Sequence, residues 1–181
     1  MRDPLLEWLG RLTGALSAAG VEYAVAGGLA VSAWAEPRAT VDIDLVIRGD
    51  PAVLTVVRAT ARDAGLLQTN ARVRAFRRVR LLRMLVPPGA DPEPIAVDLL
   101  LPGDALTDAV LHNAKPLQLG RRRVRFASAE DTVLLKLLRD SDQDRVDIRA
   151  LAAAAKLDRP YLRGWAKRLG VLTRLRRVGL R

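Results

Sequence analysis

The sequence predicts an α+β (α/β) fold, in which a mixed β-sheet flanked by helices is followed by an all-helical C-terminal segment. Short apolar runs of strand length alternate with helical patterns through residue 126, and only helical patterns follow it. No stretch rich in Gly, Ser or Pro separates the two parts. We therefore expect an α/β core over 1–126 with a helical segment over 127–181 packed on it.

The first half of the chain supplies most of the expected sheet. Leu5, Leu9, Leu12 and Leu16 recur at helical spacing and predict a helix over 4–19, which Gly20 ends. The elements expected after it are a strand over 21–26, a short helix over LAVSAWA, a strand over 41–47, a helix over 51–64, and paired strand-like segments over 72–80 and 81–86.

The second half completes the sheet and adds the helices. After a loop over 87–94 we expect a strand over 95–101, a helix over 104–114, and a hairpin of PLQL and VRF around Gly120. Ser128 and Asp131 form a capping-box pattern that predicts a helix through 140. Three further helices are expected near 142–155, 158–169 and 171–178.

The composition excludes several kinds of site and a membrane-spanning protein. The 181 residues include no cysteine, which excludes disulfides and thiolate metal sites, and no apolar run approaches the roughly 20 residues that a membrane span requires. We expect a cytoplasmic protein without membrane contact. The net charge of +10 comes from 26 arginines and four lysines, and both a nucleic-acid partner and a compositional bias explain it.

Three aspartates are expected to gather on one face of the sheet. Residues two apart on a strand share a face, so Asp42 and Asp44 lie opposite Ile43 and Leu45, and Asp98 faces away from the apolar side of its own strand. If the two strands are neighbours, the carboxylates converge, and such a cluster requires a cation. Oxygen ligands favour Mg²⁺ or Mn²⁺, in an arrangement suited to two-metal phosphoryl transfer.

Gly27 and Gly28 lie just upstream, where a strand passes into a helix. Exposed backbone N–H groups at such a helix start bind phosphate oxygens. A paired-acid strand alone also fits a structural salt bridge, and a glycine pair alone also fits a turn. The ordered combination of strand, glycine pair, short helix and acid pair favours a metal–nucleotide site.

The segment GGLAVSAWAEPRATVDIDLVI resembles the nucleotidyltransferase superfamily that includes DNA polymerase β, and more narrowly the AbiEii-like nucleotidyltransferases of bacterial defence and toxin–antitoxin systems. The R-x-T-x-D-x-D pattern is present as Arg38, Thr40, Asp42 and Asp44. The resemblance implies a nucleotidyltransferase fold in which Asp42, Asp44 and Asp98 are the catalytic metal ligands, with Asp98 also helping to deprotonate the attacking hydroxyl.

The later segment SAEDTVLLKLLRDSDQDRVDI is similar to the family's helical motifs. The resemblance implies that Lys136 contacts nucleotide phosphates and that Asp147 orients this lysine or positions the nucleotide. A structural pair between Lys136 and Asp147 on adjacent helices is the alternative. Arg38 either contacts phosphate or fixes the entry to the strand.

These observations together predict a nucleotidyltransferase that moves a nucleoside monophosphate from an NTP to a hydroxyl, with Mg²⁺ or Mn²⁺ as cofactor. The acceptor is an RNA 3′ end (tRNA included) or a protein, and a cognate toxin or antitoxin is an expected partner. Two alternatives stay open. One is a non-catalytic, antitoxin-like binding module of the same fold, and the other is a small-molecule transferase of the antibiotic-modifying type.

Overall fold

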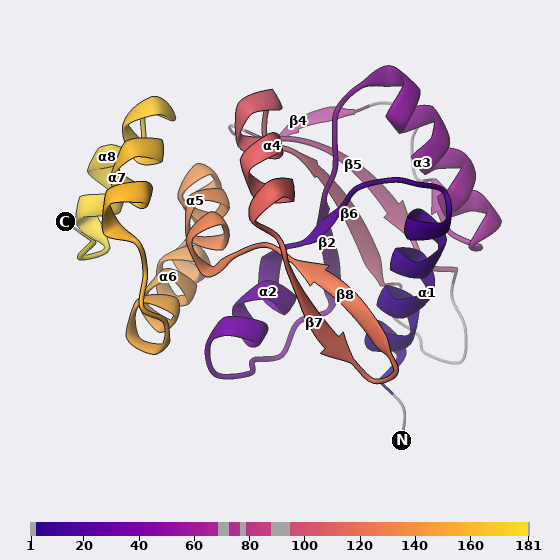
Figure 1. Ribbon diagram of the computed structural model, residues 1–181, viewed down its shortest axis with the longest axis horizontal. Coiled ribbons are helices and arrows are strands. Elements are labelled where there is room, and N and C mark those ends of the chain that lie inside the picture. The colour runs from indigo at the N-terminus through magenta and orange to yellow at the C-terminus, as the bar shows by residue number, and fades with distance from the viewer. Residues whose placement is uncertain (1–2, 69–72, 77–78, 88–94, 181) are drawn as a thin grey trace.

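The computed structural model describes residues 3–68, 73–76, 79–87 and 95–180. Within these residues the chain forms eight strands in one mixed sheet and eight helices (Figure 1). The strands are β1 (Ala24–Val25), β2 (Asp42–Val46), β3 (Leu67–Gln68), β4 (Arg74–Phe76), β5 (Val79–Leu85), β6 (Ala96–Leu101), β7 (Lys115–Leu119) and β8 (Arg122–Phe126). The helices are α1 (Pro4–Ala18), α2 (Gly27–Trp34), α3 (Pro51–Asp63), α4 (Asp104–Asn113), α5 (Ala129–Arg139), α6 (Asp142–Ala154), α7 (Arg159–Arg168) and α8 (Leu172–Arg177).

The sheet has the strand order β3-β5-β6-β2-β1-β8-β7, and β4 also pairs with β5. The central strands β2 and β6 run parallel, and β1 runs parallel to β8, whereas β5 and β6, β1 and β2, and β7 and β8 are antiparallel. The expected mixed sheet flanked by helices is confirmed. The parallel pairing of β2 with β6 brings the two acid-bearing strands side by side.

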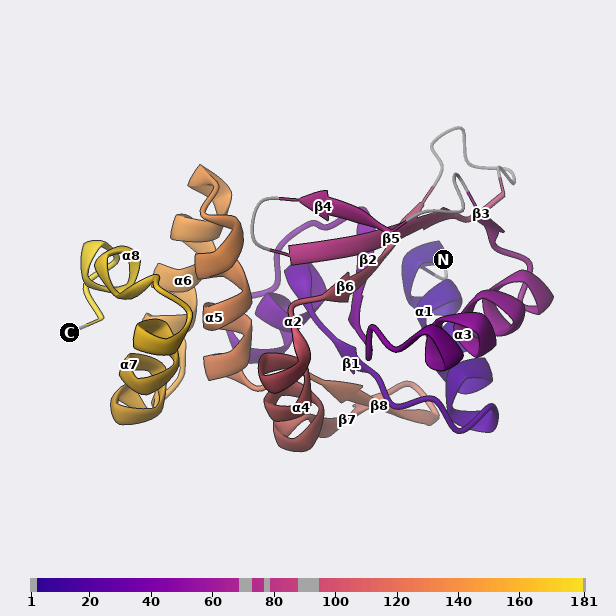
Figure 2. The same ribbon diagram turned by 90° about the horizontal axis from the view of Figure 1, so that it is seen from above.

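Each face of the sheet packs against its own hydrophobic cluster. Leucines of α1 pack with Ile43, Leu45 and Leu99 on one face, together with residues of α3. The other face meets α4 and α5, and α6, α7 and α8 extend that cluster. Figures 1 and 2 show α1 and α3 on one side of the sheet and α5 to α8 gathered on the other. Asp42 and Asp44 alternate with Ile43 and Leu45, so they face the α5 side.

The boundary expected at residue 126 falls between the end of β8 and the start of α5. Buried residues of α5 to α8 share one cluster with Ala24, Val46 and Val110 of the sheet and α4. The helical segment therefore packs directly on the core. No helix in the described part of the chain is long and apolar enough to span a membrane.

The strand expected over 21–26 is shorter than predicted and covers only Ala24–Val25. Val21 donates its N–H to the carbonyl of Leu16 at 2.9 Å, which closes the C-terminal turn of α1 after Gly20 and keeps this part of the backbone out of the sheet. Most of the loop expected over 87–94, and Arg72, Arg77 and Arg78 of the arginine-rich stretch, lie outside the described residues.

Helix caps follow the sequence pattern with one difference. The Ser128 hydroxyl accepts from the Asp131 N–H at 3.0 Å, as expected, but the Asp131 carboxylate binds the Ser128 hydroxyl instead of a backbone N–H. Tyr161 and Asn113 also donate to this carboxylate, which turns it toward α7 and α4. The complete capping box lies at Ser141 and Asp144.

Candidate active site

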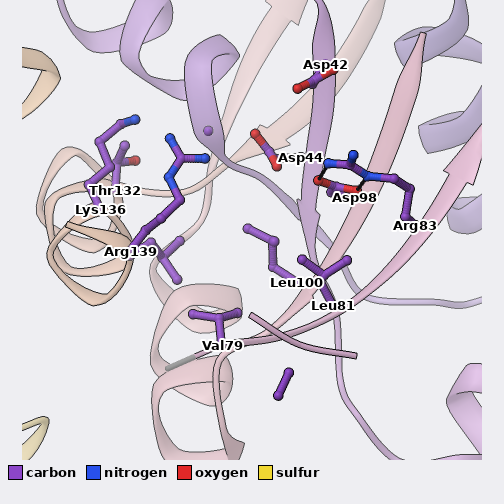
Figure 3. A pocket seen from close by; sticks show the side chains of 13 residues that line it. Asp42, Asp44, Val79, Leu81, Arg83, Asp98, Leu100, Thr132, Lys136 and Arg139 are labelled. Carbon is purple, nitrogen blue, oxygen red and sulfur yellow. Dashed lines mark hydrogen bonds and ion pairs between the residues drawn. The ribbon is translucent and has the colours of Figure 1, made fainter. Parts of the chain in front are cut away.

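A cavity of about 450 Å³ opens between the α5 side of the sheet and α5 itself (Figure 3). The acidic side chains and Arg83 lie on the sheet wall, Lys136 and Arg139 lie on the helix wall, and apolar side chains lie at one end. The lining residues are Gly27, Asp42, Asp44, Ala75, Val79, Leu81, Arg83, Asp98, Leu100, Thr132, Leu135, Lys136 and Arg139. Five of the eight residues singled out in the sequence therefore line one cavity.

The three aspartates converge as the strand parity predicted. Asp44 lies directly opposite Asp98 in the parallel register of β2 and β6, and Asp42 precedes it by one pleat on the same face. Figure 3 shows the three side chains on the cavity wall. The convergence needs both the parity and this register, since a one-residue slip would turn the acids into the apolar core.

The carboxylates of Asp42 and Asp44 carry uncompensated charge. Burial raises the pKa of Asp44 to about 6, and Asp98 and Asp42 act in the same direction against the opposing effect of Arg139 and Lys136. Burial, and next the charge of Asp98, also raises the pKa of Asp42. No side chain in the described ranges forms an ion pair or hydrogen bond with either carboxylate.

The glycine pair is required by close approach to the acid strand. Gly27 has φ +60°, and a Cβ atom there would lie 1.7 Å from Oδ2 of Asp44. At Gly28 a Cβ atom would lie 2.6 Å from the Thr40 hydroxyl. Any larger residue at either position would push the acid-bearing segment away from α2. The glycines and the R-x-T-x-D-x-D segment therefore form one packed unit.

The N-terminus of α2 opens toward the cavity. Its N-cap residue is Ala26, so no side chain caps the first turn, and Gly27 lies in the cavity wall. Free backbone N–H groups at a helix start attract anions. Gly28 lies behind Gly27, against Thr40, and outside the cavity lining.

Arg83 is a site residue that the sequence analysis did not find. It lies on β5 directly opposite Asp98 of β6 and binds it with two hydrogen bonds, Nε to Oδ1 at 2.7 Å and Nη2 to Oδ2 at 2.6 Å. The hydrogen bond to Asp98 raises the pKa of the arginine. The signal for this pair is the antiparallel register of β5 and β6, which the sequence alone does not reveal.

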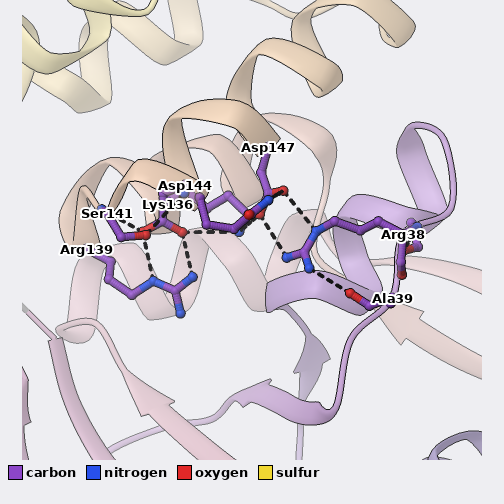
Figure 4. A network of polar contacts seen from close by, with 9 residues as sticks. Arg38, Ala39, Lys136, Arg139, Ser141, Asp144 and Asp147 are labelled. Carbon is purple, nitrogen blue, oxygen red and sulfur yellow. Dashed lines mark hydrogen bonds and ion pairs between the residues drawn. The ribbon is translucent and has the colours of Figure 1, made fainter.

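Lys136 is held by two buried aspartates of α6 (Figure 4). Its Nζ lies 2.6 Å from Oδ2 of Asp147 and 3.2 Å from Oδ1 of Asp144. Burial alone would raise the pKa of Asp144, but hydrogen bonds from Arg139 and Ser141 lower it to about 2. The structural pair considered as an alternative is therefore present, and the same lysine also lines the cavity.

Arg38 binds the same carboxylate from the other side. Its Nη2 donates to Oδ2 of Asp147 at 2.9 Å, and its Nη1 donates to the carbonyl of Ala39 (Figure 4). Arg38 and Asp147 lie outside the cavity lining. The contact ties the segment between α2 and β2 to α6, which matches the expected alternative in which Arg38 fixes the entry to the strand.

Comparison with known proteins identifies the family. A family model described as "Nucleotidyl transferase AbiEii toxin, Type IV TA system" matches residues 12–170. The chain belongs to the AbiEii nucleotidyltransferase family. It is therefore a nucleotidyltransferase, as the sequence resemblance predicted. A search of curated proteins gave no significant match.

Solved structures similar to this AbiEii-family chain share its fold. The antibiotic-resistance factor ANT(2'')-Ia matches with a TM-score of 0.60 and 13% identity, over 97% of this chain and 94% of that one. An antigenic nucleotidyltransferase-like protein from Paracoccidioides brasiliensis gives 0.58 and 18%, over 96% and 91%. JHP933 from Helicobacter pylori gives 0.51 and 14%, over 94% and 76%.

Arg139 and Thr132 are further cavity residues of this AbiEii-family protein that the sequence analysis missed. They lie three residues after and four residues before Lys136, so one face of α5 presents all three to the cavity. Arg139 makes two hydrogen bonds to Asp144, at 2.8 and 2.6 Å. The helical spacing from Lys136 is the signal that would have found them.

A divalent cation fits beside Asp42 and Asp44. Two carboxylates without a protein cation, next to a helix start, form the hard-oxygen environment that Mg²⁺ and Mn²⁺ prefer. Among the described residues no three acidic or histidine side chains are arranged to hold one ion together. Asp42 and Asp44 are the residues that would hold such an ion, while Asp98 is bound by Arg83.

Proposed function

We propose that this protein transfers a nucleoside monophosphate from an NTP to a hydroxyl group, with Mg²⁺ or Mn²⁺ bound by Asp42 and Asp44. The observation that carries the proposal is the pair of half-buried carboxylates, bound by no side chain of the described residues, beside the open N-terminus of α2. Such a site is destabilising unless a cation neutralises it. A metal-bound triphosphate would supply the cation for Asp42 and Asp44 and the anion for the N-terminus of α2.

In the proposed reaction the acceptor hydroxyl oxygen bonds to the α-phosphorus, and the bond from that phosphorus to the β-bridging oxygen breaks. Pyrophosphate leaves, and the hydroxyl proton passes to solvent or a nearby base. A bound divalent ion would neutralise the charge that develops on the phosphate oxygens. The chain contributes positioning and fixed charge, which carry most of the barrier reduction in phosphoryl transfer.

We assign the nucleotide contacts to the cavity wall. Gly27, with Gly28 behind it, presents the N–H groups of α2 to phosphate oxygens, and Lys136 and Arg139 face the same space from α5. Arg38 and Asp147 lie behind Lys136, and we propose that they position it. The expected roles of Asp98 as metal ligand and proton acceptor stay predictions.

The acceptor we propose is an RNA 3′ end, tRNA included, or a protein, and the basic surface favours RNA. Membership of a family described as a toxin of a toxin–antitoxin system supports a cognate antitoxin as partner. NTP and RNA are both abundant in the cytoplasm, which is the compartment we propose.

Label transfer tests the proposal. Purified protein is incubated with Mg²⁺ or Mn²⁺ and each [α-³²P]NTP, together with total RNA, cell-lysate protein or an aminoglycoside. We expect label in the RNA or protein fraction, none from [γ-³²P]NTP because pyrophosphate leaves, and none with Asp42→Asn/Asp44→Asn.

Asp63→Asn is the matched control, because Asp63 is an exposed acid on α3 that pairs, within the described part of the chain, with its neighbour Arg62. It should transfer label like the wild type. Label on the aminoglycoside alone would favour the small-molecule alternative. No label on any acceptor, with unchanged folding, would favour the non-catalytic module.

A further inference from the structure

The side chain opposite the third aspartate is a cation of the protein itself. Arg83 reaches across from β5 and engages both oxygens of Asp98, at 2.7 and 2.6 Å. A bidentate guanidinium–carboxylate pair is among the strongest and most directional polar contacts in proteins. Asp98 is only 7% exposed, so little of its carboxylate is left open to another cation.

Both residues of the pair line the cavity, with Asp98 buried and Arg83 partly exposed at its edge. Arg83 shares a face of β5 with Val79 and Leu81, and all three line the same wall as Asp42 and Asp44. The charges of Asp42 and Asp44 also raise the pKa of Arg83, after its hydrogen bond to Asp98. Figure 3 shows the guanidinium against Asp98 on the acidic wall. Arg83 is therefore the guanidinium that contacts the acidic wall directly, while Arg139 and Lys136 act on Asp44 from the α5 side.

Charge balance leaves room for one divalent ion. The Arg83 guanidinium offsets the charge of Asp98, and a single divalent cation would offset the charges of Asp42 and Asp44, in addition to the more distant Lys136 and Arg139. In two-metal sites the ions lie roughly 3.5–4 Å apart and share carboxylate ligands. A second ion bridging to Asp98 would have to displace Arg83 or lie against its positive charge, and both are unfavourable in a partly buried site.

We propose that Arg83 takes the place of a second metal ion, so that the site binds one divalent ion on Asp42 and Asp44 while the guanidinium holds Asp98. This inference rests on the proposed function. Arg83 acts here as a positioning residue: it fixes Asp98 and supplies a permanent positive charge on the acidic wall of the cavity. The site then depends on the metal carried by the nucleotide and not on a second, independently bound ion.

Counting ions per chain tests the inference without measuring activity. Equilibrium dialysis with Mn²⁺ and saturating α,β-methylene analogues of the four NTPs gives the ions and nucleotides bound per chain. We expect one Mn²⁺ per bound nucleotide in the wild type. Arg83→Gln removes the charge and should raise the count to two, whereas Arg83→Lys should keep it at one.

Arg80→Gln is the matched control, because Arg80 is an exposed arginine on the same strand with the opposite parity. It should bind one ion. The EPR spectrum gives an independent readout, since two Mn²⁺ ions roughly 3.5–4 Å apart are spin-coupled and a single ion is not.

Two ions in the wild type would overturn the inference and leave the proposed function standing. A single ion in Arg83→Gln would also overturn it, because Arg83 would then not be what excludes the second ion. Failure of the wild type to bind any Mn²⁺ with any analogue would contradict the proposed function itself. The same dialysis experiment therefore distinguishes failure of this inference from failure of the proposed function.

Discussion

Two pairs of aspartates in this molecule meet opposite electrostatic surroundings. Asp144 and Asp147 on α6 are bound by Lys136, Arg139 and Arg38, and hydrogen bonds lower their pKa against the effect of burial. Asp42 and Asp44 on β2 have raised pKa values and no such partners in the described part of the chain. The first pair stabilises the fold. We propose that the carboxylates of the second pair bind a cationic ligand.

The basic residues connect the two pairs. Lys136 and Arg139 line the cavity, yet each is bound by Asp144. Their long side chains are thereby held in place before any nucleotide arrives, which lowers the entropy lost on binding. The same residue type thus stabilises the fold where cationic side chains bind it, and we propose that it binds a ligand where they do not.

The largest effect is expected from Asp44→Asn. Loss of a metal-ligand charge should lower transfer activity by on the order of 1,000-fold. The raised pKa means that the ionised side chain destabilises the metal-free protein at neutral pH, so the variant should be more stable by about 1–2 kcal/mol. Label transfer and urea unfolding without metal measure the two effects. A less stable Asp44→Asn protein would contradict the contrast between the pairs.

Asp144→Asn should have the opposite effect on stability. It removes the carboxylate charge that binds Arg139 and that Lys136 contacts in addition to Asp147, and we expect a loss of about 3 kcal/mol at neutral pH. The lowered pKa of Asp144 contributes stability that is present above pH 3.8 and lost as the pH falls toward 2. The deficit relative to wild type should therefore shrink between pH 4 and 2 in denaturant titrations. A constant deficit across that range would contradict the assignment.

Gly27→Ala tests whether the close approach of Gly27 to Asp44 on β2 is required for stability and metal binding. The new Cβ would overlap the Asp44 carboxylate at a backbone conformation that disfavours it, and we expect a loss of about 2–3 kcal/mol with impaired Mn²⁺ binding. Gly20→Ala is the matched control, because Gly20 has φ +70° with nothing within 4 Å of its Cβ position. Its loss should stay near 1 kcal/mol, with Mn²⁺ binding unchanged. Equal effects would show that only backbone strain matters.

The smallest expected effect is on the pH dependence of metal binding. Since only ionised carboxylates bind the ion and the pKa of Asp44 is raised to about 6, Mn²⁺ affinity should rise about fivefold between pH 5 and 6, reach about tenfold by pH 7 and level off above it. The acids of α6 stay ionised throughout this range. Calorimetric titration from pH 5 to 8 measures it, and a flat profile would show that burial does not perturb Asp44.

The sequence predicted those parts of the site that depend on local pattern. Strand parity placed Asp42, Asp44 and Asp98 on one face, and helical spacing placed Lys136 on a helix. Arg83 was missed because its role comes from the register of β5 against β6, which is a tertiary property. The buried contacts of Asp144 and Asp147 likewise depend on how α6 packs on α5.

For the fold, too, the sequence predicted the elements that show a local pattern and missed those that do not. Apolar periodicity indicated the long helices and the apolar strands, whereas the two-residue strand β3 has too few residues to show a pattern. The strand at 21–26 was overestimated, because the turn that ends α1 uses Val21. Gly27 and Gly28 were singled out as nucleotide-binding residues, which stays a prediction, and their close approach to Asp44 and Thr40 became visible only in the structure.

Equilibrium binding of each NTP with Mg²⁺ or Mn²⁺ tests the central claim most directly, with Asp42→Asn/Asp44→Asn compared with the wild type and with Asp63→Asn. The account predicts metal-dependent nucleotide binding by the wild type and by Asp63→Asn, and its loss in the double variant while the fold is retained. Nucleotide binding that survives in Asp42→Asn/Asp44→Asn, or no binding by the wild type, would contradict it.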